Sequence, residues 1–128
     1  MENNWRNKSL QSLEKDDWGK TPAGASRLVI RCHELRQIPL SEFTTEDIRI
    51  MIGQQIGLNY VIPLAIEKLK QSILAEGDLY PGDLLVNITN VPTKFWSANK
   101  SFLDELKELI KTSREQINEE GLRIGSDW

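Results

Sequence analysis

Hydrophobic residues recur every three or four positions along most of this chain, and no segment alternates strictly between apolar and polar residues. The clearest stripe is Ile62, Ile66, Leu69 and Ile73, whose spacings of four, three and four residues place them on one face of a helix. A spacing of this kind favours α-helix over strand. The pattern therefore predicts a helical protein without a sheet.

Capping residues divide the N-terminal third into short helices. A short helix is expected to start at Ser9 and to end near Trp18-Gly19. Ser26 is placed to cap a second helix running to about Arg36, in which Leu28, Val29, Cys32 and Leu35 supply the apolar spacing. Residues 27–32 alone are also compatible with a strand, because Leu-Val-Ile is β-prone. The helix is preferred because residues 33–36 continue its pattern.

The middle of the chain predicts two more helices. Thr44 caps the first, with Asp47 in the capping-box position, and its apolar face is Ile48, Met51, Ile52 and Ile56. Gly57 suits the position just after its end, where a positive φ is needed. Pro63 suits the first turn of the next helix, which is expected to end at Gly77.

A turn and a long helix complete the pattern. Tyr80-Pro81-Gly82-Asp83 has the composition of a type II turn, and Asp83 is expected to cap the helix that carries Leu84, Leu85 and Ile88. Ser101 is expected to cap the last helix, whose apolar face is Phe102, Leu103, Leu106, Leu109, Ile110 and Ile117. The fold class is therefore all-α: a compact bundle of short helices in a single domain, residues 1–128, with less ordered flanks at 1–17 and 120–128.

Composition indicates a cytoplasmic protein. No run reaches the ~20 apolar residues that a membrane span needs, and residues 1–6 lack the apolar run of a secretory signal. The single cysteine, Cys32, cannot form an internal disulfide. We therefore expect the cytoplasm as the compartment and no membrane contact.

Charge is unevenly distributed within a net charge of −3. Residues 1–33 carry six basic and four acidic residues, residues 34–83 four basic and eight acidic, and residues 84–128 six basic and seven acidic. An acidic middle argues against direct nucleic-acid binding, which relies on clustered Lys and Arg. The same charges are also compatible with a solvated surface that has no partner.

Candidate chemistry is sparse. Cys32 and His33 suggest a nucleophile with its base, but adjacent helical residues point about 100° apart, and there is no second histidine. A zinc site needs three or four ligands. The paired carboxylates, such as Glu46-Asp47, lie at helix starts or turns, where capping explains them. We expect no catalytic residues, no metal and no cofactor, and hence no enzyme.

Four aromatic residues lie near predicted turns: Trp18, Tyr60, Tyr80 and Trp96. They are compatible with packing at the corners of the core. They are also compatible with a protein-binding patch, because Tyr and Trp dominate interface hot spots.

The stretch from Trp18 to Trp96 resembles the immunity proteins of bacterial contact-dependent growth inhibition (CDI) systems. The strongest part of the resemblance is the run from Ala75 to Leu85, Ala-Glu-Gly-Asp-Leu-Tyr-Pro-Gly-Asp-Leu-Leu. The chain departs from the family at Ser72-Ile73, where similar proteins tend to have Asn-Pro. The other residues that carry the resemblance are Trp18-Gly19, Pro22, Leu35-Arg36, Pro39-Leu40, Glu46-Asp47-Ile48-Arg49, Ile52-Gly53-Gln54, Ile56-Gly57-Leu58, Pro63-Leu64-Ala65 and Phe95-Trp96.

The resemblance implies a cytosolic protein that binds the C-terminal toxin domain of a large secreted effector, commonly a nuclease, and blocks its active site. We expect a one-to-one complex with that domain and a monomer when free. The candidate contact residues are acidic and aromatic: Glu42, Glu46, Asp47, Glu76, Asp78, Tyr80 and Asp83. The alternative function is a non-catalytic helical adaptor for another cellular protein.

Overall fold

The computed structural model describes residues 4–128, which contain eight α-helices, two short 3-10 helices and no strand. One isolated bridge pairs Ser9 with Pro39. The predicted all-α class is therefore confirmed. None of the helices in this part of the chain has both the length and the apolar character needed to cross a membrane.

The first helices begin where the sequence predicts. After η1 (Trp5–Asn7), Ser9 caps α1 (Leu10–Glu14), and Ser26 caps α2 (Arg27–Leu35) by accepting the Val29 N–H. The helical interpretation of residues 27–32 is thus confirmed. The predicted end of α1 near Trp18 is wrong: Lys15 takes a left-handed conformation, and residues 15–26 connect α1 to α2 without a helix.

The end of α3 differs from the prediction. A short η2 (Leu40–Glu42) leads to α3 (Thr45–Gly53), whose N-terminus has the predicted capping box of Thr44 and Asp47. Its C-terminus is a Schellman turn with Gln55 at φ +57°, in which the Ile56 N–H reaches the Met51 carbonyl. Ile56 therefore lies outside the helix. Gly57 does have a positive φ, but it is the residue before α4 and not the one that ends α3.

The next helix is also shifted. Helix α4 (Leu58–Gln71) starts five residues before Pro63, so this proline lies inside the helix and not in its first turn. The proline leaves the carbonyl of the exposed Asn59 without its helical N–H donor, which solvent can replace. The helix ends at Gln71, six residues before Gly77, although the four-residue stripe from Ile62 to Ile73 is buried as predicted.

The C-terminal half contains four helices. Tyr80–Asp83 forms the predicted type II turn, with Gly82 at φ 89° and ψ 3° and the Asp83 N–H donating to the Tyr80 carbonyl. Asp83 is not the predicted cap but the first residue of α5 (Asp83–Thr89). After α6 (Thr93–Ala98), the single helix predicted from Ser101 is two helices, α7 (Lys100–Thr112) and α8 (Arg114–Glu120).

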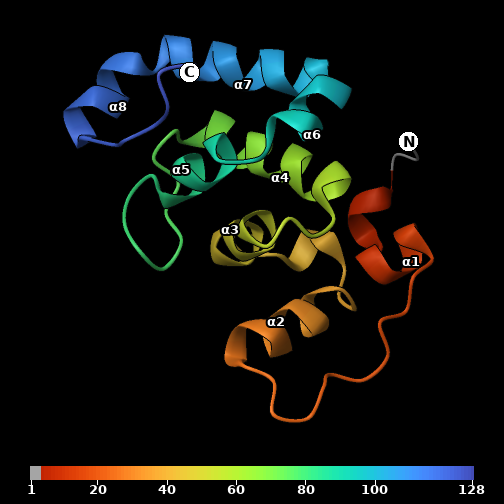
Figure 1. The fold of residues 1–128 in the computed structure, drawn as a ribbon. Coiled ribbons are helices and arrows are strands. Elements are labelled where there is room, and N and C mark those ends of the chain that lie inside the picture. Colours follow the sequence, from red (N-terminus) through yellow and green to blue (C-terminus); the bar gives the residue numbers. More distant parts are fainter. Residues whose placement is uncertain (1–3) are drawn as a thin grey trace.

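The helices stack in tiers with α3 near the middle (Figure 1). Helix α3 packs against α2 on one side and against α4 and α5 on the other, while α4 packs against α7. Figure 1 shows α2 and α7 on opposite sides of the molecule. The fully buried side chains at the centre include Met51, Ile62, Leu84 and Ile110. These residues come from α3, α4, α5 and α7, so one core joins the tiers.

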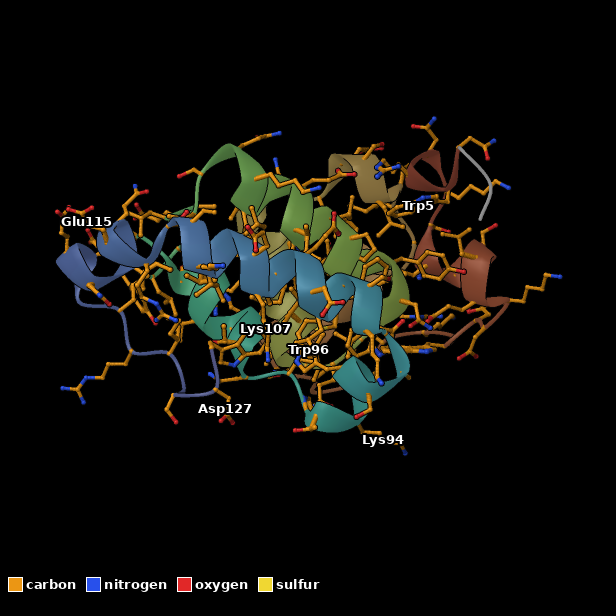
Figure 2. The ribbon with its side chains drawn as sticks, turned by 90° about the horizontal axis from the view of Figure 1, so that it is seen from above. Trp5, Lys94, Trp96, Lys107, Glu115 and Asp127 are labelled. Atoms are coloured by element: carbon orange, nitrogen blue, oxygen red, sulfur yellow. The ribbon has the colours of Figure 1, made fainter. Side chains whose placement is uncertain are left out.

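The C-terminal tail, which we expected to be less ordered, packs against the bundle. The indole Nε1 of Trp128 donates to the Thr89 carbonyl at 3.2 Å, and its ring lies edge-on to Trp96. Figure 2 shows Trp96, Lys107 and Asp127 along the same side of α7. Leu122 lies so close to Gly82 that a Cβ there would clash with it. The tail therefore braces the 80–83 turn.

Candidate functional site

The expected contact residues gather around the first turn of α3 and the loop formed by residues 76–80. Glu46 connects the two, because its Oε1 accepts the Asp78 N–H at 2.8 Å. Arg49, one turn further along α3, donates its Nε to the same oxygen at 2.7 Å and its Nη2 to Glu46 Oε2. This bidentate pairing lowers the pKa of Glu46 and raises that of Arg49, with burial opposing both shifts.

Asp83 holds the same loop from inside. Its side chain is almost completely buried and accepts the Gly77 N–H at 2.7 Å and the Leu79 N–H at 3.0 Å. Arg49 Nε lies 3.7 Å from Asp83 Oδ2, so one guanidinium balances both carboxylates. A buried charge is tolerated when it is paired and hydrogen-bonded in this way.

Position 77 requires glycine because the backbone there passes close to the carboxylates of Glu46 and Asp83. A Cβ at this position would collide with Glu46 Oε1 and lie 3.1 Å from Asp83 Oδ2. The Glu-Gly-Asp run is thus explained by geometry: the glycine lets the backbone pass between two carboxylates.

Asp47 has a different role. It closes the capping box by accepting the Thr44 N–H at 3.0 Å, and it accepts Arg31 Nη2 of α2 at 3.0 Å. Its side chain is buried. Asp47 therefore joins α2 to the start of α3.

The seven expected contact residues divide into two groups. Asp47 and Asp83 are buried and Glu46 is mostly so, and all three make internal hydrogen bonds, so the free protein does not present them to a partner. The other four are exposed: Glu42 in η2, and Glu76, Asp78 and Tyr80 in the 76–80 loop. Within residues 4–128, none of the three exposed carboxylates makes an ion pair. The structure brings Glu76, Asp78 and Tyr80 together and leaves Glu42 outside the loop.

Tyr80 lies at the edge of a shallow hollow of about 360 Å³ between the loop and the C-terminal tail. Leu79, which sequence reasoning did not select, is 61% exposed beside it. An aliphatic and an aromatic side chain thus project from a loop whose backbone is fixed by two carboxylates.

The other three aromatic residues near predicted turns also divide into those that pack in the fold and one that reaches the surface. Trp96 is buried and donates its Nε1 to the Val91 carbonyl, and Tyr60 packs on the buried Trp5. Trp18 is 39% exposed and covers the guanidinium of the buried Arg36 at 4.3 Å, while Arg36 pairs with Glu14. Trp96 and Tyr60 therefore belong to the fold, and Trp18 reaches the surface.

The Cys32-His33 pair has no geometry for nucleophilic catalysis. Cys32 is buried, and burial raises the pKa of its thiol, which favours the unreactive protonated form. His33 lies edge-on against Trp18, with ring centroids 5.2 Å apart. In the part of the chain that the structure describes, no three His, Cys, Asp or Glu side chains gather as a metal site would require.

Two of the four residues that supply the predicted apolar spacing of α2, Leu28 and Val29, are not buried. Only Cys32 and Leu35 of α2 reach the core, while Leu28, Val29 and Ile30 are 38–40% exposed. The sequence did contain a signal: three consecutive helical residues span about 200°, so they cannot all face one core. The role of Arg31 had no such signal, because its partner Asp47 lies on another helix, whereas the spacing of three residues between Glu46 and Arg49 was a local signal for their ion pair.

Taken together, the structure is an all-α protein whose most elaborate surface feature is a braced, acidic and aromatic loop. The profile of the CDI immunity protein family matches residues 12–106, which is well over half of the chain. The chain therefore belongs to the CDI immunity proteins. No curated protein sequence and no solved structure matches it.

Proposed function

We propose that this protein acts in the cytoplasm by binding the C-terminal toxin domain of its cognate CDI effector and neutralising it without chemistry of its own. Membership of the family supports the toxin as the partner. We choose the 76–80 loop as the toxin-binding surface because it presents the Asp78 carboxylate and the Tyr80 ring on a backbone that Glu46 and Asp83 fix in place.

A rigid loop suits tight binding, because little conformational entropy is lost when it docks. Tyr80 and Leu79 supply desolvated contact area, and Glu76 and Asp78 supply charge. The acidic middle of the chain would attract a basic partner and speed its encounter. We therefore propose a nuclease toxin, whose phosphate-binding cleft is covered while exposed carboxylates occupy the positions of substrate phosphates.

The complex should contain one copy of each protein. A standard interface buries about 1,600 Å² in total, and protection of a cell calls for a nanomolar dissociation constant, or about −12 kcal/mol. Calorimetric titration with the toxin domain encoded immediately upstream, with nuclease activity assayed in parallel, tests this directly. Tight one-to-one binding that abolishes activity is expected, and the absence of binding at micromolar concentration would refute the proposal.

Charge reversal tests the surface. Glu76→Lys/Asp78→Lys should slow association and reduce its dependence on salt, because these carboxylates are exposed and steer the encounter. Asp104→Lys/Glu108→Lys is the matched control, since it changes the net charge equally on exposed positions of α7. Equal affinities for the two double variants would show that the 76–80 loop is not the contact.

A non-catalytic adaptor for another cellular protein is the alternative, and gene context separates the two. An immunity gene should lie directly after a large effector gene.

An enzyme would require Cys32 or His33, and its activity would be lost when both are replaced by alanine.

A further inference from the structure

The C-terminal tail, residues 121–128, is attached to the bundle at both of its ends. At its start, Leu122 packs so closely on Gly82 that a Cβ on that glycine would collide with both Cδ atoms of the leucine. At its end, the Trp128 indole donates its Nε1 to the Thr89 carbonyl at 3.2 Å. The tail is thus fixed at two points, and its start touches the turn that closes the candidate site.

Leu122 meets this turn at its most adaptable residue. The Pro81–Gly82 peptide is the central peptide of the type II turn, and its N–H donates to the Leu74 carbonyl at 3.1 Å. A flip of this peptide would convert the turn to type I, remove that hydrogen bond and change the φ of Gly82 from +89° to a negative value. Because Leu122 packs directly on Gly82, movement of the turn requires the tail to move as well.

The Tyr80 side chain depends on the turn for its placement. The two carboxylates that brace the loop accept the N–H groups of residues 77–79 and do not hold the tyrosine ring. The ring is 41% exposed and borders the hollow of about 360 Å³, whose lining includes residues 121–123 of the tail. Removal of the Leu122 side chain would enlarge this hollow and give the ring room to turn away from the surface.

We propose that Leu122 is a positioning residue for toxin binding, which holds the 80–83 turn so that the Tyr80 ring faces the toxin domain. This inference rests on the proposed function. Residues 107–128 lie outside the region that the family profile matches, so family membership assigns no role to the tail. A ring that is already held in its bound orientation loses little conformational entropy on docking. Leu122 is uncharged, so it slows dissociation without affecting the charge-steered encounter.

The test is a double-mutant cycle of Leu122→Ala and Tyr80→Ala, titrated with the toxin domain encoded upstream. Leu122→Ala alone should weaken binding roughly tenfold, mainly through faster dissociation and with unchanged salt dependence, because a misplaced tyrosine loses its hot-spot contact. In the Tyr80→Ala background the same change should cost no further affinity, since Leu122 acts through that ring. A general loss of stability would instead weaken both backgrounds equally.

Two control variants separate positioning from stability. Leu122→Met conserves the volume of the side chain and should bind like wild type. Leu13→Ala makes the same truncation at another partly buried leucine, on α1, which lies at the opposite end of the bundle from α8 (Figures 1 and 2). It should bind like wild type although it lowers stability. The Gly82 amide should exchange its hydrogen faster in Leu122→Ala than in Leu13→Ala, because only the first change loosens the turn.

The outcomes distinguish this inference from the proposed function. If the wild-type protein binds the toxin domain and Leu122→Ala binds equally well, or if the effects in the cycle are additive, the positioning role is overturned and the proposed function stands. Wild-type affinity in Tyr80→Ala would also overturn the positioning role. No binding by the wild-type protein would overturn both.

Discussion

Replacing Asp83 by asparagine tests the idea that one buried carboxylate shapes the 76–80 loop. In the wild-type protein, the two carboxylate oxygens accept the N–H groups of Gly77 and Leu79 at 2.7 and 3.0 Å, and Arg49 lies nearby. Asparagine has nearly the same volume but only one acceptor oxygen. Its amide NH₂ would face a backbone N–H, so one buried donor would lose its partner.

The size of the effect follows from these contacts. A hydrogen bond to a charged group contributes about 1.5–3 kcal/mol, and an unsatisfied buried donor costs about 1–3 kcal/mol. These two contributions describe the same contact and overlap, so they are not added. The free energy of unfolding of Asp83→Asn is therefore expected to be about 3 kcal/mol below that of the wild type. For a domain of this size, 1 kcal/mol shifts the melting temperature by roughly 3–5 °C, so Asp83→Asn should melt ~10 °C below wild type.

Urea denaturation and thermal melting followed by circular dichroism measure both quantities. Asp78→Asn is the control: the same chemical change on an exposed carboxylate five residues earlier should stay within about 0.5 kcal/mol of wild type. If Asp83→Asn also stays within that range, the carboxylate does not hold the loop and the proposed bracing is wrong.

Three further predictions concern other parts of the fold. Gln55→Gly should stabilise the protein by about 0.5–1 kcal/mol, seen as a higher urea midpoint, because glycine relieves the left-handed strain at φ +57°; an unchanged or lower midpoint would contradict this. The pKa of Glu46 is lowered by its hydrogen bonds with Arg49, so its stabilising effect should be complete above the ordinary pKa of a glutamate, ~4.3, and lost as the pH falls through the lower folded value. Glu46→Gln should therefore be less stable than wild type at pH 7 and approach it in acid, and parallel stability–pH curves would refute the pairing. Cys32 should resist a thiol-specific reagent in the native protein and react fully in denaturant, because it is buried and its pKa is raised; rapid stoichiometric labelling of the folded chain would contradict its placement.

Local signals in the sequence were sufficient for most helix starts. Ser26 and Thr44 each cap the helix that they were predicted to cap, and Ser9 caps the helix that was predicted to start there, because an N-cap hydrogen bond joins residues only three apart. A residue that suits two different positions relative to a helix was assigned to the wrong one. A glycine with positive φ suits both the end of one helix and the residue before the next, and Gly57 takes the second role.

In the candidate site, too, local sequence patterns predicted one part and distant contacts decided the rest. The sequence located the acidic and aromatic run from Glu76 to Asp83, but not which of its carboxylates would be exposed. Asp83 turns inward because Gly77, Leu79 and Arg49 surround it, whereas Asp78 donates its backbone N–H to Glu46 and its side chain stays exposed. Such partners lie up to 34 residues away, and no local pattern identifies them.

The sequence by itself determined the all-α class, the capped starts of the early helices and the family, since periodicity, capping and motif spacing are properties of neighbouring residues. Only the tertiary structure decided which faces are covered. Helix α2 illustrates why: its apolar residues favour a helix and burial, but burial requires a neighbouring element, and α3 covers only the side that carries Cys32 and Leu35. A helical period specifies a face, and the packing of distant segments decides whether that face meets the core or the solvent.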